Sequence, residues 1–157
     1  MAQKTNVARI LDQKRIPYEL KEYSVDVADL SAPTVADKIG MPIAQVYKTL
    51  VVRGDKTGVL LVCIPGNLEL DLKSLAALSE NKKVEVVPLK EVQALTGYIR
   101  GGVSPIGTKK NYPVFIDENV KQWEKISISA GVRGCQILLH PDDLLQITQA
   151  RCGSFSR

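Results

Sequence analysis

The chain has 157 residues, of which 45% are hydrophobic and 24% are charged, a composition typical of a globular protein with a buried core. Its formal net charge of +4 permits a polyanionic partner, but the basic residues form no dense stripe of the kind that strong nucleic-acid binders carry. The three cysteines are odd in number and widely spaced, which excludes a disulfide framework and indicates a reducing, cytoplasmic setting.

The N-terminal half is predicted to mix helices and strands. The expected elements are a helix over 5–15, a strand over 17–25, a helix over 32–40 and a β-hairpin over 45–66. Thr5 and Ser31 are suitable helix caps, and Gly40 is a suitable terminator. The longest apolar run, residues 59–64, lies in the hairpin and is too short to span a bilayer, so we expect no membrane association.

The C-terminal half continues the mixed pattern. The expected elements are a helix over 71–80, a strand over 82–87, a helix over 89–97, strands over 113–120, 125–131 and 134–140, and a helix over 141–150. We expect residues 152–157 to fray. Because there is no strict βαβ rhythm and no linker, residues 1–157 are predicted to form a single domain of the α+β or mixed α/β class.

Several common catalytic devices are absent from the sequence. There is no phosphate-binding loop, no HExxH motif and no dinucleotide-binding fingerprint, and one histidine with scattered cysteines predicts no metal and no cofactor. His140 precedes a predicted helix, so a capping role is favoured over that of a catalytic base. Cys63 and Cys135 lie in apolar segments and are interpreted as core residues.

Three segments carry more polar detail than packing requires. The glycine-rich loop 101–107 can bring backbone N–H groups close to a ligand, although a plain surface turn explains it equally well. Strand alternation places Lys48 on one face with Leu50 and Val52, which indicates either a pocket or the edge of a sheet. The segment 127–134, "SISAGVRG", is by itself most simply a β-turn.

Taken together, these segments resemble the YbaK family of aminoacyl-tRNA deacylases, which is related to the editing domain of bacterial prolyl-tRNA synthetases. The matching features are "KTL" at 48–50, "TGYIRGGVSPIGTKK" at 96–110 and "SAGVRG" at 129–134, in that order along nearly the whole chain. Tyr23 matches a pocket tyrosine of the family, and Asn67 roughly matches a polar position. The "SAG" sequence replaces the more usual "SGG".

The resemblance implies a mixed, mainly antiparallel curved sheet with helices packed outside. It also implies hydrolysis of the ester of a mischarged tRNA, with Cys-tRNA(Pro) as the expected substrate and prolyl-tRNA synthetase as an expected partner. The implied site comprises Lys48, Gly101 and Gly102 as catalytic residues, Tyr23, Thr49, Asn67, Ser104, Ser129 and Gly131 as substrate-binding residues, and Lys109, Lys110 and Arg133 as tRNA-binding residues.

The sequence offers groups that stabilise a transition state but no evident protein nucleophile. In the mechanism proposed for the family, the thiol of the substrate cysteine attacks its own carbonyl and expels the tRNA. Two alternatives stay open: hydrolysis of another ester such as Ala-tRNA(Pro) by an activated water, and a non-catalytic module that binds tRNA ends or a synthetase.

Overall fold

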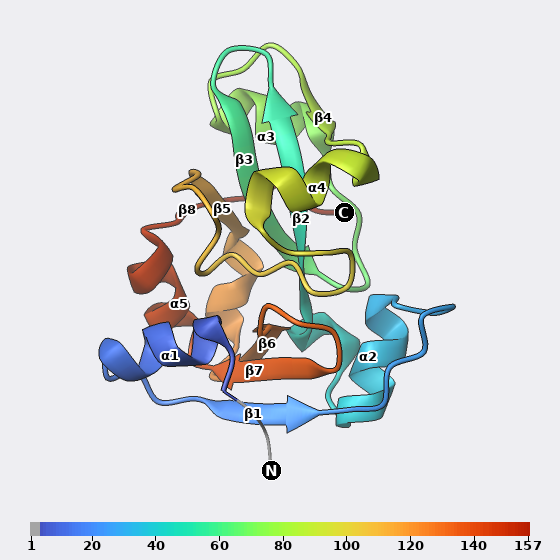
Figure 1. Cartoon of the computed structure of the whole chain (residues 1–157). Coiled ribbons are helices and arrows are strands. Elements are labelled where there is room, and N and C mark those ends of the chain that lie inside the picture. Colours follow the sequence, from blue (N-terminus) through green and yellow to red (C-terminus); the bar gives the residue numbers. More distant parts are fainter. Residues whose placement is uncertain (1–3) are drawn as a thin grey trace.

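The computed structural model describes residues 4–157 and shows helices packed around β-sheets (Figure 1). The elements are, in order, α1 (Asn6–Gln13), β1 (Glu19–Glu22), α2 (Ala32–Ile39), η1 (Ile43–Gln45), β2 (Tyr47–Gly54), β3 (Gly58–Pro65), α3 (Leu72–Leu78), β4 (Val84–Val86), α4 (Leu89–Thr96), β5 (Val114–Asp117), η2 (Glu118–Gln122), β6 (Ile126–Ser129), β7 (Cys135–Leu139), α5 (Pro141–Thr148) and β8 (Arg151–Gly153). Within residues 4–157, no helix is both long and apolar enough to cross a membrane.

The strands divide into two sheets rather than one. The smaller sheet has the order β1-β7-β6, and the larger has the order β4-β2-β3-β5-β8. The pairs β3–β5 and β5–β8 are parallel, whereas β1–β7, β6–β7, β2–β3 and β2–β4 are antiparallel. A parallel bridge between Val46 and Ser127 joins the two sheets beside the start of β2. The predicted α+β class with mainly antiparallel pairing is confirmed.

Helix boundaries follow local signals that are visible in the sequence. Thr5 Oγ1 accepts a hydrogen bond from the Ala8 N–H at 3.2 Å at the start of α1, and the Asp71 carboxylate accepts one from the Ser74 N–H at 3.2 Å at the start of α3. Gly40 ends α2 in the left-handed conformation, with φ of 69°. These groups satisfy backbone donors and acceptors that the helix ends leave without partners.

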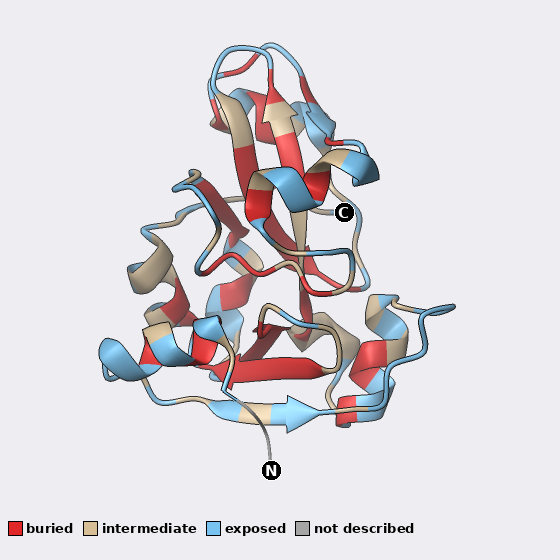
Figure 2. Cartoon of the chain, viewed as in Figure 1, coloured by how far each residue is buried: buried red, intermediate tan, exposed pale blue. Residues whose placement is uncertain are grey.

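The hydrophobic core forms on both faces of the larger sheet (Figure 2). One cluster joins β2, β3 and β5 to β6, β7 and α1, and it includes Val51, Cys63, Ile116, Ile128 and Ile137. A second cluster packs α3 against the opposite face and includes Val52, Leu60, Val62, Leu75 and Phe155. Cys63 and Cys135 are both buried in the first cluster, as predicted.

The C-terminal segment corrects one expectation. Residues 152–157 do not fray: β8 pairs in parallel with β5, and Phe155 is only 1% exposed. The Phe155 N–H donates to the Asp117 carboxylate at 3.0 Å, and its carbonyl accepts from the Asp71 N–H at 2.7 Å. The prediction was wrong because this order depends on partners that are remote in sequence, which a six-residue window cannot reveal.

Candidate active site

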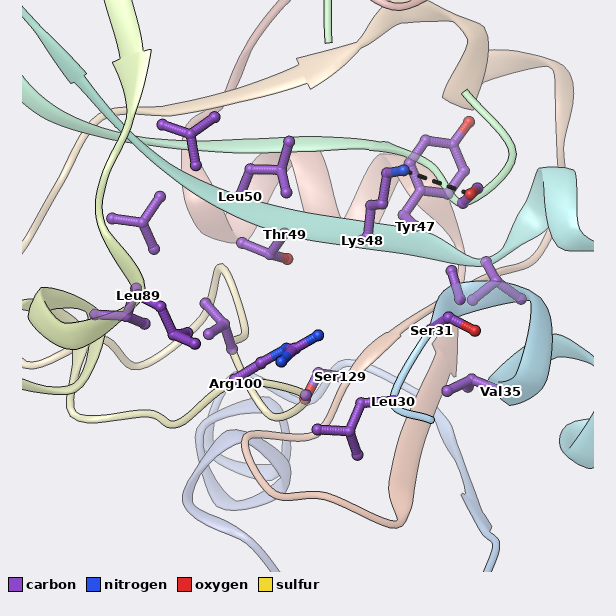
Figure 3. Close-up of a pocket in the computed structure, with 18 of the residues that line it drawn as sticks. Leu30, Ser31, Val35, Tyr47, Lys48, Thr49, Leu50, Leu89, Arg100 and Ser129 are labelled. Atoms are coloured by element: carbon purple, nitrogen blue, oxygen red, sulfur yellow. Dashed lines mark hydrogen bonds between the residues drawn. The ribbon is translucent and has the colours of Figure 1, made fainter. Parts of the chain in front are cut away.

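A cavity of about 640 Å³ opens between β2, the start of α2 and the segment that follows α4 (Figure 3). This volume lies in the range of pockets that enclose small-molecule ligands. The lining residues are Leu30, Ser31, Ala32, Pro33 and Val35; residues 46–51 of β2 and the turn before it; Gly66; Val86, Val87, Leu89 and Val92; Arg100, Gly101 and Val103; and Ser129 and Gln136. The site is therefore assembled from segments far apart in the sequence.

One wall of the cavity is the open edge of β2. The short strand β4 pairs only with Val52–Gly54, so the first half of β2 has β3 on one side and the cavity on the other. The Val51 carbonyl accepts a hydrogen bond from the Val87 N–H at 2.9 Å on this open side. Because hydrogen-bond direction alternates along an antiparallel strand, the backbone N–H and C=O of Thr49 also point toward the cavity.

Lys48 enters the cavity from the same strand. Its Nζ donates to the Gly66 carbonyl oxygen at 3.5 Å, a long contact that leaves donor capacity for a ligand (Figure 3). Burial lowers the Lys48 pKa below its ordinary value of 10.5, although Glu69 acts in the opposite direction. The site therefore holds an ammonium group whose charge is poorly solvated and is available to stabilise negative charge.

The start of α2 forms the neighbouring wall. Ser31 occupies the predicted cap position, but its hydroxyl makes no capping bond and instead donates to the Asp29 carboxylate at 2.6 Å. Thr34 also hydrogen-bonds to Asp29, and these bonds lower the Asp29 pKa to about 2. Asp29 is therefore ionised at neutral pH, and the hydrogen bonds that it accepts hold the loop leading into the helix.

The glycine-rich loop meets this wall at Gly101. This residue has φ of 85°, and a Cβ on it would lie 3.2 Å from Leu30 Cδ1, so glycine permits both the conformation and the close approach. Gly102 does not line the cavity, and its N–H already donates to the Ile99 carbonyl at 2.8 Å. Gly102 instead permits close packing on the Val132 backbone, because a Cβ on it would lie 3.1 Å from the Val132 carbonyl carbon. Its catalytic role stays a prediction.

Strands β6 and β7 contribute two polar side chains. Ser129 is 8% exposed, and its Oγ accepts from the Gly131 N–H at 3.1 Å, which leaves the hydroxyl proton available to a ligand. Gln136 is 5% exposed, and its Oε1 accepts from the Ser127 hydroxyl at 2.7 Å. This bond fixes the amide plane of Gln136, whose side chain lines the cavity.

Several predicted substrate-binding residues lie outside the lining. Tyr23 packs on a cluster that includes Val35 and Val46, so it supports the cavity wall from behind. Asn67 is exposed in the turn after Gly66. Ser104 is fully buried, and its Oγ accepts from the backbone N–H of the residue two positions later at 3.4 Å. The Ser104 hydroxyl therefore has no accessible surface in this structure, and its contact with substrate stays a prediction.

Gly131 and the predicted tRNA-binding cations also lie outside the cavity lining. A Cβ on Gly131 would lie 3.0 Å from the Tyr98 ring, which indicates a packing role. Lys109 and Lys110 are exposed on the segment beyond the loop. Arg133 is half-buried, and its Nε donates to a backbone carbonyl oxygen of the loop, that of Arg100, at 2.7 Å.

Sequence reasoning missed three polar residues of the cavity: Ser31, Arg100 and Gln136. Gln136 could have been found, because a glutamine within the apolar strand segment "GCQILLH" is unusual at a buried position. Arg100 could not have been found from the sequence, because an arginine in a loop is ordinarily a solvated surface residue. Its position became significant only when the fold placed the loop opposite β2.

The described residues that line the cavity include no acid, histidine or cysteine. Cys63 lies beneath Thr49, with its Sγ 3.6 Å from Thr49 Oγ1, and burial raises the Cys63 pKa to about 12. His140 caps α5, since its Nδ1 accepts from the Asp142 N–H at 3.0 Å, as expected. Within residues 4–157, no group of three or more His, Cys, Asp or Glu side chains is arranged to hold a metal ion.

Comparisons with known proteins agree with this architecture. A family model described as the aminoacyl-tRNA editing domain matches residues 28–147. The chain is 48% identical over 149 residues to "Putative Cys-tRNA(Pro)/Cys-tRNA(Cys) deacylase EbsC" of Enterococcus faecalis (strain ATCC 700802 / V583), covering 95% of this chain and 91% of that protein. It is 31% identical over 110 residues to a proline--tRNA ligase of Sulfurihydrogenibium sp. (strain YO3AOP1), covering 70% of this chain and 19% of the ligase.

A solved structure described as "a putative trans-editing enzyme for prolyl tRNA synthetase" has the same fold, with a TM-score of 0.84 at 24% identity and coverage of 98% of both chains. The resemblance noted in the sequence is confirmed by these matches. Because the family model spans most of the chain and the relative from Enterococcus faecalis matches over nearly its whole length, this chain belongs to the family of aminoacyl-tRNA editing domains.

Proposed function

We propose that residues 1–157 act as a single trans-editing domain that cleaves the aminoacyl ester of Cys-tRNA(Pro). The observation that carries the proposal is a cavity that holds the Lys48 ammonium and the open edge of β2, and whose described lining residues include no cysteine, histidine or carboxylate. The names of the relatives point to the same substrate class. Such an arrangement suits a substrate that brings its own nucleophile.

The chemistry follows from the groups present. The thiol of the esterified cysteine has an ordinary pKa near 8.5, so a small thiolate fraction exists at neutral pH. The thiolate attacks the ester carbonyl, a C–S bond forms and the C–O bond to the terminal ribose breaks. The departing ribose oxygen takes up a proton, and the amino acid leaves as a thiolactone. Lys48 and the Thr49 backbone N–H stabilise the negative charge that develops on the carbonyl oxygen.

The surrounding residues have supporting roles in this proposal. The Ser129 hydroxyl and the Gly101 backbone hold the amino group or the ribose of the substrate, and Tyr23 and Asn67 support the site from its surroundings. Lys109, Lys110 and Arg133 neutralise phosphates of the acceptor stem, a contribution that does not depend on base sequence. We further propose that the domain acts in the cytoplasm and that prolyl-tRNA synthetase supplies recognition of the tRNA.

A deacylation panel with Cys-, Ala-, Ser- and Pro-tRNA(Pro) tests the proposal. We expect rapid cleavage of the cysteine ester and little acceleration of the other three. Preferential cleavage of Ala-tRNA(Pro) would instead indicate attack by an activated water. Slower hydrolysis of every ester in the presence of the protein would identify a binding module without catalytic activity.

A further inference from the structure

Arg100 is a cation of the cavity to which neither the resemblance nor the proposed chemistry assigns a role. It follows α4 and immediately precedes Gly101, and its side chain extends into the cavity from the side opposite β2 (Figure 3). Lys48 enters from β2 itself. The cavity therefore has two cationic groups, one delivered by the strand and one by the loop.

The Arg100 guanidinium has no carboxylate partner in the part of the chain that the structure describes. The ion pairs found there are Lys4–Asp12, Arg53–Glu91, Lys125–Glu19 and His140–Asp142. Asp29, the acid next to the lining residues of α2, already accepts hydrogen bonds from Ser31 and Thr34. A guanidinium that extends into a cavity without a protein acid is suited to bind an anionic ligand.

The backbone of Arg100 is held firmly although its side chain is exposed. The Arg133 Nε donates to the Arg100 carbonyl oxygen at 2.7 Å, and the Gly102 N–H closes a turn onto the Ile99 carbonyl at 2.8 Å. These two bonds fix the loop on both sides of the residue. A positioned backbone reduces the entropy cost of ordering the loop when a ligand binds.

The remainder of the lining suggests how a ligand would lie. Apolar side chains from the end of β4 to α4, namely Val86, Val87, Leu89 and Val92, line the cavity, and its polar groups include Lys48, Ser31 and Ser129. An apolar surface of this kind accepts a flat nucleobase. The sugar and its charged substituents would then lie near the cations.

We propose that Arg100 binds the phosphodiester on the 5′ side of the terminal adenosine while Lys48 holds the aminoacyl ester. The inference rests on the proposed function, in which the substrate carries the ester and this phosphodiester on one nucleoside. The ester has no carboxylate of its own, so the phosphodiester is the anion that lies closest to the reacting carbonyl. The planar guanidinium can contact two phosphate oxygens at once, which a lysine cannot.

A pair of minimal substrates that differ by a single phosphate tests this assignment. We expect the protein to cleave 3′-O-cysteinyl-adenosine 5′-monophosphate with a kcat/KM about 10-fold or more above that of 3′-O-cysteinyl-adenosine, as expected for charge-assisted hydrogen bonds. Arg100→Gln should remove most of this preference, because it should lower kcat/KM for the phosphate-bearing ester far more than for the phosphate-free ester. Arg100→Lys should retain part of the preference.

The matched control is Arg9→Gln, which removes the same charge from an exposed position of α1 outside the cavity lining and should keep the full preference. An equal loss on both esters in Arg100→Gln, or no preference in the wild-type protein, would overturn the assignment. If the wild-type protein cleaves neither of these esters nor Cys-tRNA(Pro), the proposed function fails. Titration with adenosine 5′-monophosphate against adenosine then still decides the role of Arg100, because only the phosphate-bearing ligand should bind more weakly to Arg100→Gln.

Discussion

At the scale of single residues, Lys48 lowers the stability of the fold while it serves the proposed function. A lysine on a strand face shared with Leu50 and Val52 loses hydration on folding, and burial lowers its pKa accordingly. The partner that the fold offers is a backbone carbonyl at 3.5 Å rather than a carboxylate. This arrangement costs stability in the absence of substrate and offers an available cation to a developing oxyanion.

We expect Lys48→Met to lose ~10²–10³-fold in the rate of Cys-tRNA(Pro) cleavage, the range seen when one oxyanion donor is removed. Methionine keeps most of the aliphatic volume, so the loss should reflect charge rather than packing. Single-turnover kinetics measure the effect. A rate near that of the wild-type protein would show that Lys48 is merely a charge at the edge of the sheet.

The same variant should be more stable than the wild-type protein, by ~0.5–2 kcal/mol at neutral pH. Because the folded-state pKa of Lys48 lies below its unfolded value, the unfolded chain binds the proton more tightly, and wild-type stability increases as the pH rises from the folded pKa toward 10.5. The advantage of Lys48→Met should therefore be greatest below the folded pKa and shrink as the pH rises toward 10.5. Thermal melts across this pH range test the sign, and an advantage that grew with pH would contradict it.

The cysteines of the protein are expected to be chemically inert. Burial raises the Cys63 pKa to about 12, so its thiol stays protonated at neutral pH even though it lies 3.6 Å from Thr49 Oγ1. Cys63→Ala should reduce stability by about 1 kcal/mol and leave the chemical step nearly unchanged. Cys135→Ala and Cys152→Ala should behave similarly. A cysteine variant that folds normally but has no activity would identify a protein nucleophile.

At the scale of secondary-structure elements, the loop at Gly101 offers a test with an internal control. Gly101 has φ of 85° and Gly40 has φ of 69°, so alanine is strained at both positions. Gly40 lies at the end of α2, where a Cβ would have nothing within 4 Å, whereas Gly101 lines the cavity against Leu30. The two sites therefore separate backbone strain from effects on the cavity.

We expect Gly101→Ala and Gly40→Ala each to lose about 1–2 kcal/mol of stability, the usual cost of a left-handed residue other than glycine. Only Gly101→Ala should also lower kcat/KM for Cys-tRNA(Pro). Parallel melting curves and rates separate the two effects. If the two variants retained equal activity, the loop would be a structural turn alone.

Much of the element pattern is predictable from the sequence because the signals are local. The hairpin of β2 and β3, the cap at Asp71 and the ends at Gly40 and Gly97 depend on residues within a few positions of one another. The strand β8 could not be predicted, because it is three residues long and is ordered by β5. The open edge of β2 could not be predicted from the sequence either, because it depends on where the pairing with β4 ends.

At the scale of the whole molecule, the site depends on long-range assembly. Lys48 and Ser129 could be proposed from the sequence, and the cavity contains both. The burial of Ser104 could not be predicted, because burial of an individual loop residue depends on the packing of the complete fold. That Arg100 lines the cavity could be recognised only from the fold, which places the segment after α4 opposite β2.

In the proposed mechanism, the cavity stabilises the transition state while the substrate supplies the nucleophile. Single-turnover cleavage of Cys-tRNA(Pro) and Ser-tRNA(Pro), measured side by side with the wild-type protein, tests this division of roles. The two side chains are similar in size, but a hydroxyl is a much weaker nucleophile than a thiol at neutral pH. We expect the cysteine ester to be cleaved much faster than the serine ester. Comparable rates on the two esters would contradict this mechanism and would require a water or a protein group as the nucleophile.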